Sequence, residues 1–376
     1  MNFFKRKWVW GGLAIIGVVL VIFVDFDSFG SPGTEASPSI SKGSISEALN
    51  SPDTTDIKNA VVANGSNQKI LSLHYPIIQT FNNCPAGGLA ITLSYYGIIR
   101  TQSEIADELR PNWNLNGKND DKSTPPERVA EGAKKYGFIP YYRANGSIEL
   151  LKKFIANDTP ILMRTKLNSY EPYHHYIVVS GYDDVTGEII QDDSYYGSDI
   201  RYKYSDFLKL WKHYNYEYVV LATPENRGTI EKILGGELDQ MKSWQNAVAG
   251  AQSELVKNPN DNVARFNLAV SLYYTGDYAR AVSEFEKVES SLSKYALWFR
   301  IEPIKAYFEL KNDTRVFSLA DKIFADGNLG YSELYLVRGK TYLRDGKTDL
   351  AKKDFEKAVF YNENFKEAKE ALAGAN

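Results

Sequence analysis

The spacing of apolar residues changes along the chain and predicts regions of different structure. Between residues 68 and 224, short β-branched runs alternate with segments in which apolar residues recur every three or four positions. The first pattern is typical of strands and the second of amphipathic helices. From residue 225 onward only the helical period remains. Residues 27–67 show neither pattern and are rich in Ser, Gly, Pro, Asp and Thr, which predicts a flexible linker.

The region 68–224 contains predicted helices followed mainly by predicted strands. Helical spacing with capping or stop residues predicts helices over 84–97, 101–109, 125–137, 147–158 and the segment YSDFLKLWKHY. Short β-branched runs bounded by turn residues predict strands in ILSLHYPII, TPILMRTKL, HHYIVVSGYD, EIIQDD and YEYVVLAT. Helices first and strands afterwards favour an α+β domain with an antiparallel sheet.

The last third of the chain repeats a helical hairpin. Gly276 in NLAVSLYYTGDYARAVSEFEKV and Gly346 in RGKTYLRDGKTDLAKKDFEKAV lie 70 positions apart, which is twice 35. A degenerate copy, AYFELKNDTRVFSLADKI, lies between them, and SWQNAVAGAQSELVKNP supplies a half-repeat before them. Small residues let the helices of a hairpin approach, and aromatic residues fill the gap to the next hairpin. The pattern resembles the tetratricopeptide repeat, so we predict a helical connector at 225–258 and an all-α repeat solenoid at 259–376.

The N-terminal segment predicts a membrane anchor. Residues 8–24 carry no charge, and at about 1.5 Å per residue such a helix spans about 26 Å, the short end of what crosses a bilayer. Lys5, Arg6 and Lys7 precede it and favour a cytoplasmic N-terminus. We expect residues 1–26 to form a cytoplasmic tip and a single transmembrane helix, with all later domains outside the cytoplasm. A cleaved signal peptide is the alternative, although no small-x-small cleavage site follows the apolar run.

Charge and cysteine content limit the classes of function that we expect of the chain. With 44 Lys and Arg against 47 Asp and Glu, the net charge is −3 and no basic stripe occurs, so we expect no nucleic-acid partner. Cys84 is the only cysteine, so no intramolecular disulfide can form. An unpaired thiol outside the cytoplasm is a liability unless it is buried or used. We predict no cofactor and no metal site.

Cys84 stands at the start of a predicted helix, in NNCPAGGLA. A cysteine becomes an effective nucleophile when an imidazole or a helix N-terminus favours its thiolate. The dipole of this helix would do so, with Asn82 or Asn83 as its cap, and the Gly-Gly pair behind the cysteine would keep the surface open. Gln79, five residues upstream, could aim its side-chain amide at an oxyanion.

The partners of a catalytic cysteine must come from later in the chain. PYHHYIVVSGYDD offers His174 and His175 at the edge of a predicted strand. EIIQDDSYYG presents Asp192 and Asp193 at the end of the next strand. A carboxylate there could hold the imidazole through its second ring nitrogen, as in any set of nucleophile, base and orienting group. Position in the strand alone leaves both choices open.

The order Gln, Cys, His, Asp resembles papain-like cysteine peptidases. The segments QTFNNCPAGGLAITLSYYG, SEIADELRP, HYIVVSGYDD and IIQDDSYYG are similar to the C39-like peptidase group, whose members clip double-glycine leaders from bacteriocins. The resemblance covers roughly residues 68–224 and implies a papain-like fold. It also implies that Cys84 is the nucleophile, His175 the base, Asp193 its orienting group and Gln79 part of the oxyanion hole. An aromatic residue after the histidine selects His175, and the spacing to a Tyr-Gly pair selects Asp193.

The chain departs from the family pattern at two places. It has Cys-Pro-Ala-Gly where Cys-Gly-Pro-Ala is common, and Ser194 where proline commonly follows the aspartate. The first departure stiffens the turn beside the nucleophile, and neither removes a catalytic group. No phosphate-binding GxxxxGK[ST] loop occurs in the sequence, which disfavours a transporter-coupled role.

These observations predict a membrane-anchored, extracytoplasmic cysteine peptidase. It would hydrolyse a peptide bond in a peptide or protein substrate through a Cys-His-Asp triad, while the repeats recruit a protein partner. The alternative is a catalytically silent papain-like module that binds a peptide beside a tetratricopeptide scaffold. Acyl transfer in place of hydrolysis would use the same residues. The repeats could also only brace the catalytic domain, with SWQNAVAGAQSEL packed against it.

Overall fold

A computed structural model describes residues 66–112, 121, 123–170 and 173–375. All of them belong to one compact unit, Leu49–Asn376. Within these ranges, no helix is long and apolar enough to cross a bilayer. The predicted anchor at 1–26 and nearly all of the predicted linker lie outside the described residues.

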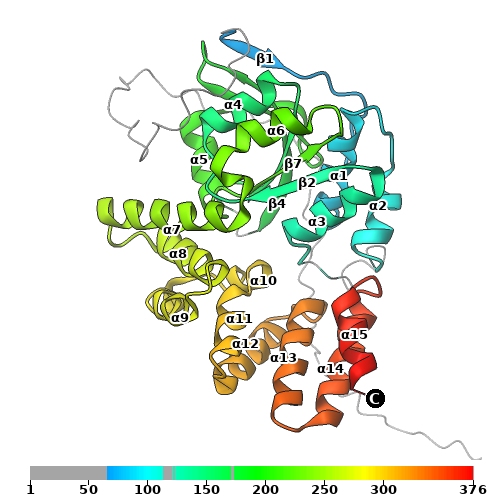
Figure 1. The fold of residues 1–376 in the computed structure, drawn as a ribbon, viewed down its shortest axis with the longest axis vertical. Helices are drawn as coiled ribbons and strands as arrows, with labels where there is room; N and C mark the ends of the chain where they lie inside the picture. The colour runs from blue at the N-terminus through cyan, green and yellow to red at the C-terminus, as the bar shows by residue number, and fades with distance from the viewer. Residues whose placement is uncertain (1–65, 113–120, 122, 171–172, 376) are drawn as a thin grey trace, which may run out of the picture. The chain divides into compact units, whose positions relative to one another are not determined.

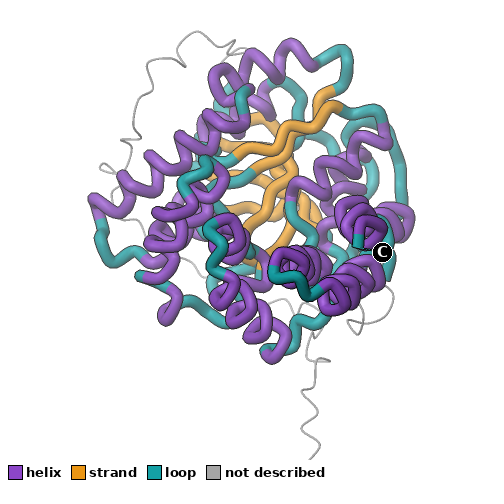
Figure 2. The backbone as a smooth tube through the Cα atoms, turned by 60° about the horizontal axis from the view of Figure 1, so that its bottom comes forward, coloured by secondary structure: helices purple, strands orange, loops and turns teal. Residues whose placement is uncertain are grey.

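A single antiparallel sheet forms the centre of the N-terminal half of this unit (Figures 1 and 2). Its strands run in the spatial order β2-β7-β3-β4-β5-β6, and β1 pairs with β4. The strands are β1 Gln68–Ile70, β2 Ile139–Arg143, β3 Ile161–Lys166, β4 His174–Asp183, β5 Glu188–Asp193, β6 Gly197–Lys203 and β7 Tyr218–Ala222. The antiparallel pairing confirms the prediction.

Three details of the predicted strands were wrong. The strand expected at ILSLHYPII lies instead at Gln68–Ile70 and shares only Ile70 with it, because the residues after Ile70 have no partner strand in the described sheet. Strands β2 and β6 were not expected. Strand β2 carries Pro140 and β6 alternates exposed with half-buried residues, so neither shows the buried β-branched run that marked the other strands.

Helices pack on both faces of the sheet (Figure 2), and β4 is therefore buried along nearly its whole length. The cluster on one face contains Tyr176 and Val178 together with α1 Cys84–Ser94, α2 Gln102–Leu109 and α3 Pro126–Ala133. The cluster on the other face contains Ile177 and Val179 together with α4 Ile148–Ala156, α5 Tyr204–Lys212 and α6 Arg227–Leu234. Successive residues of a strand point to opposite faces, which explains the division.

Local signals set the helix ends, as the sequence predicted. Thr101 and Glu104 form the expected capping box at the start of α2. The Ser147 side chain accepts a hydrogen bond from the Leu150 amide at the start of α4. Gly137, in the left-handed conformation at φ +88°, closes the short 3-10 helix η3 (Lys134–Tyr136) that continues α3.

Every element after Ala222 in the described part of the chain is helical (Figure 1). After α6 come α7 Gln240–Lys257, α8 Asn262–Tyr274, α9 Tyr278–Glu286, α10 Ala296–Phe299, α11 Glu302–Glu309, α12 Asp313–Ala325, α13 Ser332–Arg344, α14 Thr348–Tyr361 and α15 Lys366–Gly374. Two short 3-10 turns, η4 Gly235–Leu238 and η5 Glu289–Ser291, accompany them. The pairs α8–α9, α11–α12 and α13–α14 are the three predicted hairpins.

The 35-residue period survives in the hairpin turns. Gly276 and Gly346, in the first and last copies, have φ values of +81° and +72°. The degenerate middle copy has Lys311 at the equivalent position, and its φ is +57°. Glycine adopts this left-handed region without steric cost, whereas a residue with a Cβ adopts it only under constraint. Packing of the neighbouring hairpins therefore imposes the turn where the residue type no longer favours it.

Candidate active site

Cys84 is the first residue of α1 and lies nearly buried, with 6% of its surface exposed. The chain enters the helix through a turn in which Asn82 has a φ of +54°. Asn83 occupies the cap position, but its side chain makes no capping bond. It donates instead to the Thr80 hydroxyl (3.1 Å) and accepts from Arg110 (3.1 Å). The expected cap is therefore correct in position but not in its hydrogen bond.

The two glycines behind Cys84 do not keep the surface open, contrary to the prediction. A Cβ on Gly87 would lie 2.8 Å from the Ser194 Cβ, and one on Gly88 would lie 2.8 Å from the Leu162 Cδ1. Both distances are too short for any other residue without rearrangement. The Gly-Gly pair thus lets α1 pack directly against the sheet, and this contact fixes the position of the helix that carries Cys84.

His175 and Asp193 form a buried pair across β4 and β5. The His175 Nε2 lies 2.7 Å from the Asp193 Oδ1, and both residues are only 2% exposed. Asp193 is directly opposite Ile177, two residues after His175, so both side chains leave the sheet on the same face. Asp192 is opposite Val178 and belongs to the other face. Its carboxylate accepts hydrogen bonds from the Tyr95 hydroxyl and the Asp199 amide.

Backbone and side-chain donors hold the Asp193 carboxylate in place. Its Oδ1 also accepts from the amides of Tyr195 (2.7 Å) and Tyr196 (3.2 Å), and its Oδ2 accepts from the Gln191 side chain (3.4 Å). Donors of this kind stabilise a carboxylate in its charged form and fix its orientation. The Tyr195 ring lies edge-on to His175, with centroids 6.2 Å apart. The imidazole is therefore restrained on two sides.

The electrostatic environment favours the imidazolium form of His175. Burial alone would lower its pKa, but the charge and hydrogen bond of Asp193 raise it, and so do the hydrogen bond and charge of Cys84. Together they raise the pKa of His175 from 6.5 to about 10. Because Asp193 occupies Nε2, the nitrogen available to Cys84 is Nδ1. The structure thus brings together sulfur, imidazole and carboxylate in one chain of contacts.

Gln79 lies beside this group, in the segment before Cys84. Its backbone amide donates to the Ser194 carbonyl (2.7 Å), and its side-chain Oε1 accepts from the Ser194 hydroxyl (2.8 Å). Since the carbonyl end of the amide is held by Ser194, the other end, Nε2, is the donor. An amide fixed in this way can present one N–H to a carbonyl oxygen at the nucleophile.

His174 lies on the opposite side of β4 and takes no part in this arrangement. Its ring packs on Phe299 of α10, with centroids 4.0 Å apart, and contacts Tyr176 and Tyr214 at its edges. Burial, with the positive charges of Arg164 and His175 nearby, lowers the pKa of His174 well below 6.5. His174 is therefore neutral at physiological pH and packs as an aromatic ring.

Two residues support the site without any local signal of this role in the sequence. Ser194, a departure from the family pattern, holds Gln79. Arg110 donates to the Asn82 carbonyl, the Asn83 side chain (3.1 Å) and the Asp121 carbonyl (3.2 Å), so it fixes the turn before Cys84. The segment SEIADELRP contains Arg110, but nothing local in that segment indicates a partner 28 residues upstream.

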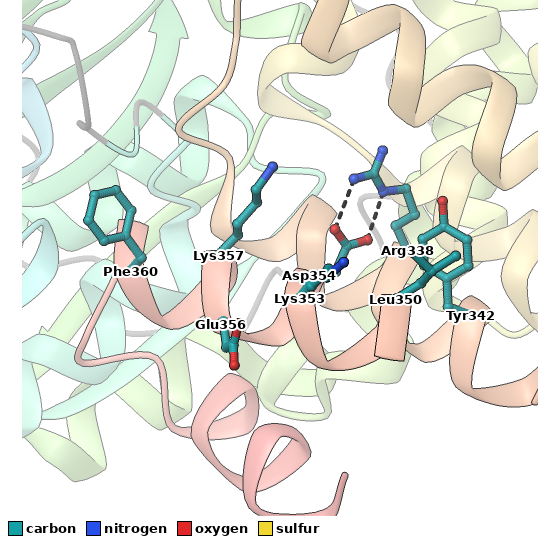
Figure 3. Close-up of a pocket in the computed structure, with 8 residues that line it drawn as sticks. All are labelled: Arg338, Tyr342, Leu350, Lys353, Asp354, Glu356, Lys357 and Phe360. Carbon is teal, nitrogen blue, oxygen red and sulfur yellow. Dashed lines mark hydrogen bonds and ion pairs between the residues drawn. The ribbon is translucent and has the colours of Figure 1, made fainter. Parts of the chain in front are cut away.

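The described residues contain no group of three or more His, Cys, Asp or Glu side chains that could hold a metal ion. A hollow of about 420 Å³ lies away from the catalytic group, on α13 and α14 (Figure 3). Across it Arg338 donates two hydrogen bonds to Asp354, at 2.7 and 2.9 Å, so these charges are already paired. We assign no chemistry to this hollow.

Comparison with known protein families gives two matching segments of the chain. Residues 66–219 match the model of the Peptidase_C39 like family, and residues 332–365 match the tetratricopeptide repeat model. No curated protein sequence matches the chain.

Three solved structures illustrate the likeness, at low identity. One is described as a C39-like peptidase from Bacillus anthracis (19% identity, 42% of this chain and 98% of that chain, TM-score 0.36). Another is the peptidase domain of Streptococcus ComA, a bifunctional ABC transporter (20%, 40% and 98%, TM-score 0.31). The third is a thermophilic repeat protein from Thermus thermophilus (22%, 38% and 77%, TM-score 0.32). The chain contains a C39-like peptidase domain at residues 66–219 and a tetratricopeptide repeat at residues 332–365.

Proposed function

We propose that the protein is a cysteine peptidase that hydrolyses a peptide bond through Cys84, His175 and Asp193. The observation that carries the proposal is the double engagement of His175, which is hydrogen-bonded to Asp193 at 2.7 Å and contacts Cys84. An imidazole held between a carboxylate and a sulfur is the arrangement that a thiolate nucleophile requires.

In the first half of the reaction, the Cys84 sulfur attacks the carbonyl carbon of the scissile bond. The C=O electrons move onto oxygen, which accepts hydrogen bonds from the Gln79 side chain and the Cys84 amide. The tetrahedral intermediate collapses as the protonated His175 gives its proton to the leaving nitrogen. The amine product departs and a thioester joins the remaining acyl group to Cys84.

In the second half, water attacks the thioester carbon while His175, now neutral, accepts the proton of the water. The second tetrahedral intermediate collapses with loss of the sulfur, and the carboxyl product is released. Asp193 remains a carboxylate throughout, and its role is to keep the imidazole oriented with Nε2–H toward itself. Cys84 and His175 return to their starting states.

Location and partners form a second part of the proposal. Residues 1–26 would anchor the chain in a membrane as a single pass with a cytoplasmic N-terminus, supported by the uncharged run behind Lys5, Arg6 and Lys7. The peptidase and repeat regions would then lie outside the cytoplasm. The repeats would bind a protein partner, since tetratricopeptide solenoids present extended binding surfaces.

The burial of the catalytic group favours one rival, a domain that binds peptides without cleaving them. Only 6% of Cys84 and 2% of His175 is exposed, so a substrate carbonyl needs some movement of the surrounding chain to reach the sulfur. A domain without that movement would keep the peptidase fold and lose turnover.

The test combines turnover with labelling of the single thiol. The full chain in detergent would be incubated with fluorescein-labelled casein and with a fluorogenic peptide that contains a Gly-Gly site. A peptide chloromethyl ketone would label Cys84. We expect cleavage and labelling in the natural chain, no cleavage in Cys84→Ala, and loss of both cleavage and rapid labelling in His175→Ala. Labelling that is unchanged in His175→Ala, together with no cleavage of either substrate, would support the binding module.

A further inference from the structure

The repeats contact the peptidase domain at several places, and we call the part that faces α3 and the sheet the domain-facing surface. It includes Asn267, Tyr274, Trp298, Phe299, Arg300 and Glu333. Farther along the repeats, Asn362 and Asn364 donate to backbone carbonyls of α2. The Tyr274 hydroxyl of α8 donates to the Glu127 carboxylate of α3 (2.6 Å), and Glu333 of α13 lies 3.7 Å from the Arg128 guanidinium. Helix α3 of the peptidase domain is thus held by the first helices of two hairpins. In the structure, the peptidase domain of the same chain covers this surface.

Buried charges join the two regions beside β4. Arg164 of β3 lies 2.7 Å from Glu217, and Arg300 of the repeats lies 3.8 Å from the other oxygen of the same carboxylate. All three side chains are at most 2% exposed. Each guanidinium stabilises the buried carboxylate, because a buried charge without partners is costly. The Arg300 contact, the longer of the two, depends on the repeats being in place.

The end of α10 packs against β4 on the face that carries His174 and Tyr176. Phe299 packs on the His174 ring at a centroid distance of 4.0 Å, and its carbonyl accepts from Arg164 (3.3 Å). His174 precedes His175 in the strand, so the two rings project to opposite sides of the same backbone. A shift of Phe299 would be transmitted to the strand position that carries the catalytic imidazole.

A second attachment restrains the repeats at the connector. The Trp244 ring of α7 stacks on Tyr274 (3.9 Å, 7°) and meets Tyr142 of β2 edge-on (6.1 Å). Next to it, the Ser243 hydroxyl accepts from the Ala144 amide and donates to the Ala144 carbonyl. One continuous cluster of buried apolar residues runs from α1 and the sheet into the hairpins. Repeats attached in this way over a shared core cannot move as a free arm.

We propose that Phe299 and Arg300 are positioning residues for His175, and that the repeats act on catalysis by holding the face of β4 that carries His174 and Tyr176. Phe299 acts on His175 through His174, and Arg300 acts through the Arg164–Glu217 pair. Neither Phe299 nor Arg300 touches the substrate. This proposal rests on the proposed peptidase function. Its test measures the pKa of His175 and the alkylation of Cys84, and it does not require turnover of a substrate. Any external protein partner of the repeats must bind a surface other than the domain-facing one.

Two measurements on the full chain in detergent test the proposal. Because Cys84 is the only cysteine, its alkylation by iodoacetamide as a function of pH reports on this site alone. Carbon-13 labelling of the four histidines gives the pKa of His175, assigned with His175→Gln. The variant is Phe299→Ala, with Phe299→Leu as a second variant that keeps apolar volume. The matched control is Phe317→Ala, whose ring packs on Tyr342 within the repeats.

We expect Phe299→Ala to lower the pKa of His175 by about one unit, which is about tenfold in proton affinity. The alkylation rate of Cys84 at pH 7 should fall severalfold, Phe299→Leu should give a smaller change in the same direction, and Phe317→Ala should change neither. Equal behaviour of the position 299 and 317 variants would overturn the proposal. If Phe299→Ala does not fold, Phe299→Leu decides the question. Absence of peptide cleavage in the natural chain would sink the peptidase function and leave these two readouts intact.

Discussion

The peptidase site and the repeats obtain their order in different ways. In the candidate site, side chains far apart in sequence such as His175 and Asp193 meet at hydrogen-bond distance. Under the proposed mechanism each of Cys84, His175 and Asp193 has one role, so exchange for a similar residue should not be tolerated. In the repeats, a 35-residue period places equivalent residues in equivalent packing, and single positions tolerate change. Lys311 keeps a glycine-like conformation in the middle turn at φ +57°. The difference teaches that the chemical type of each side chain matters at the candidate site, whereas equivalent packing and backbone conformation matter in the repeats.

Exchange of one carboxylate at the site should give the largest effect. Asp193→Asn removes the charge that orients His175, so we expect kcat to fall by about 10²–10⁴-fold, the usual contribution of general acid–base catalysis. The fold should survive, because asparagine still accepts from the Tyr195 amide. Asp192→Asn, one residue away on the other face, is the control and should change kcat little. Cleavage of the Gly-Gly peptide measures both. Reversed effects would show that Asp192 is the orienting residue.

Loss of a charge where the two regions meet should come next. Arg300→Ala leaves Glu217 with one guanidinium partner instead of two in a buried position. We expect the free energy of unfolding to fall by about 3–5 kcal/mol, measured by urea unfolding. Arg280→Ala removes an arginine of α9 that is 54% exposed and pairs with Asp277, and it should cost less than about 0.5 kcal/mol. Similar losses in both variants would mean that the buried pair adds no stability.

The raised pKa of His175 makes stability depend on pH. The group binds its proton more tightly in the folded chain (pKa about 10) than in the unfolded chain (6.5). Its stabilising contribution is therefore complete below pH 6.5 and is lost between pH 6.5 and about 10, at no more than about 1.4 kcal/mol per pH unit. Urea unfolding of the natural chain and of His175→Gln over this range isolates the contribution. Parallel pH curves for the two chains would contradict the assignment.

Removal of the hydroxyl that holds Gln79 should have a moderate effect. Ser194→Ala frees the Gln79 amide to rotate, so we expect kcat to fall about tenfold, or about 1.4 kcal/mol in the activation barrier. KM should stay nearly constant, because the amide acts on the transition state. In Gln79→Ala the same serine exchange should add nothing further. Additive losses in the double variant would show that Ser194 acts through another group.

The smallest effect is expected in the repeats. Lys311→Gly replaces a residue held at positive φ with one that adopts this conformation freely, so we expect a gain of up to about 1 kcal/mol in unfolding free energy. Gly346→Ala in the last copy should cost a similar amount. Thermal unfolding of both variants measures the difference. A loss of stability in Lys311→Gly would mean that the greater freedom of glycine in the unfolded chain outweighs the relief in the turn.

The sequence alone was sufficient for everything that depends on neighbours within a few turns. The Thr101–Glu104 box, the period between Gly276 and Gly346 and the alternation in β4 are local signals, and the structure contains the elements that they predict. Resemblance to the C39-like family supplied the choice of Asp193 and His175, which spacing left open. The structure brings those two residues together, while their catalytic role remains a prediction.

Only the tertiary structure decided the relations between distant segments. Ser194 meets Gln79 across 115 positions, and Phe299 meets His174 across 125. The sequence predicts repeats that recruit a partner or brace the peptidase domain and does not decide between the two, whereas in the structure the domain-facing surface holds the chain's own helix α3. Secondary structure and repeat period follow from the local conformational preferences of the residues. Contacts such as these depend on how whole elements pack over a shared core, and no local pattern encodes that packing.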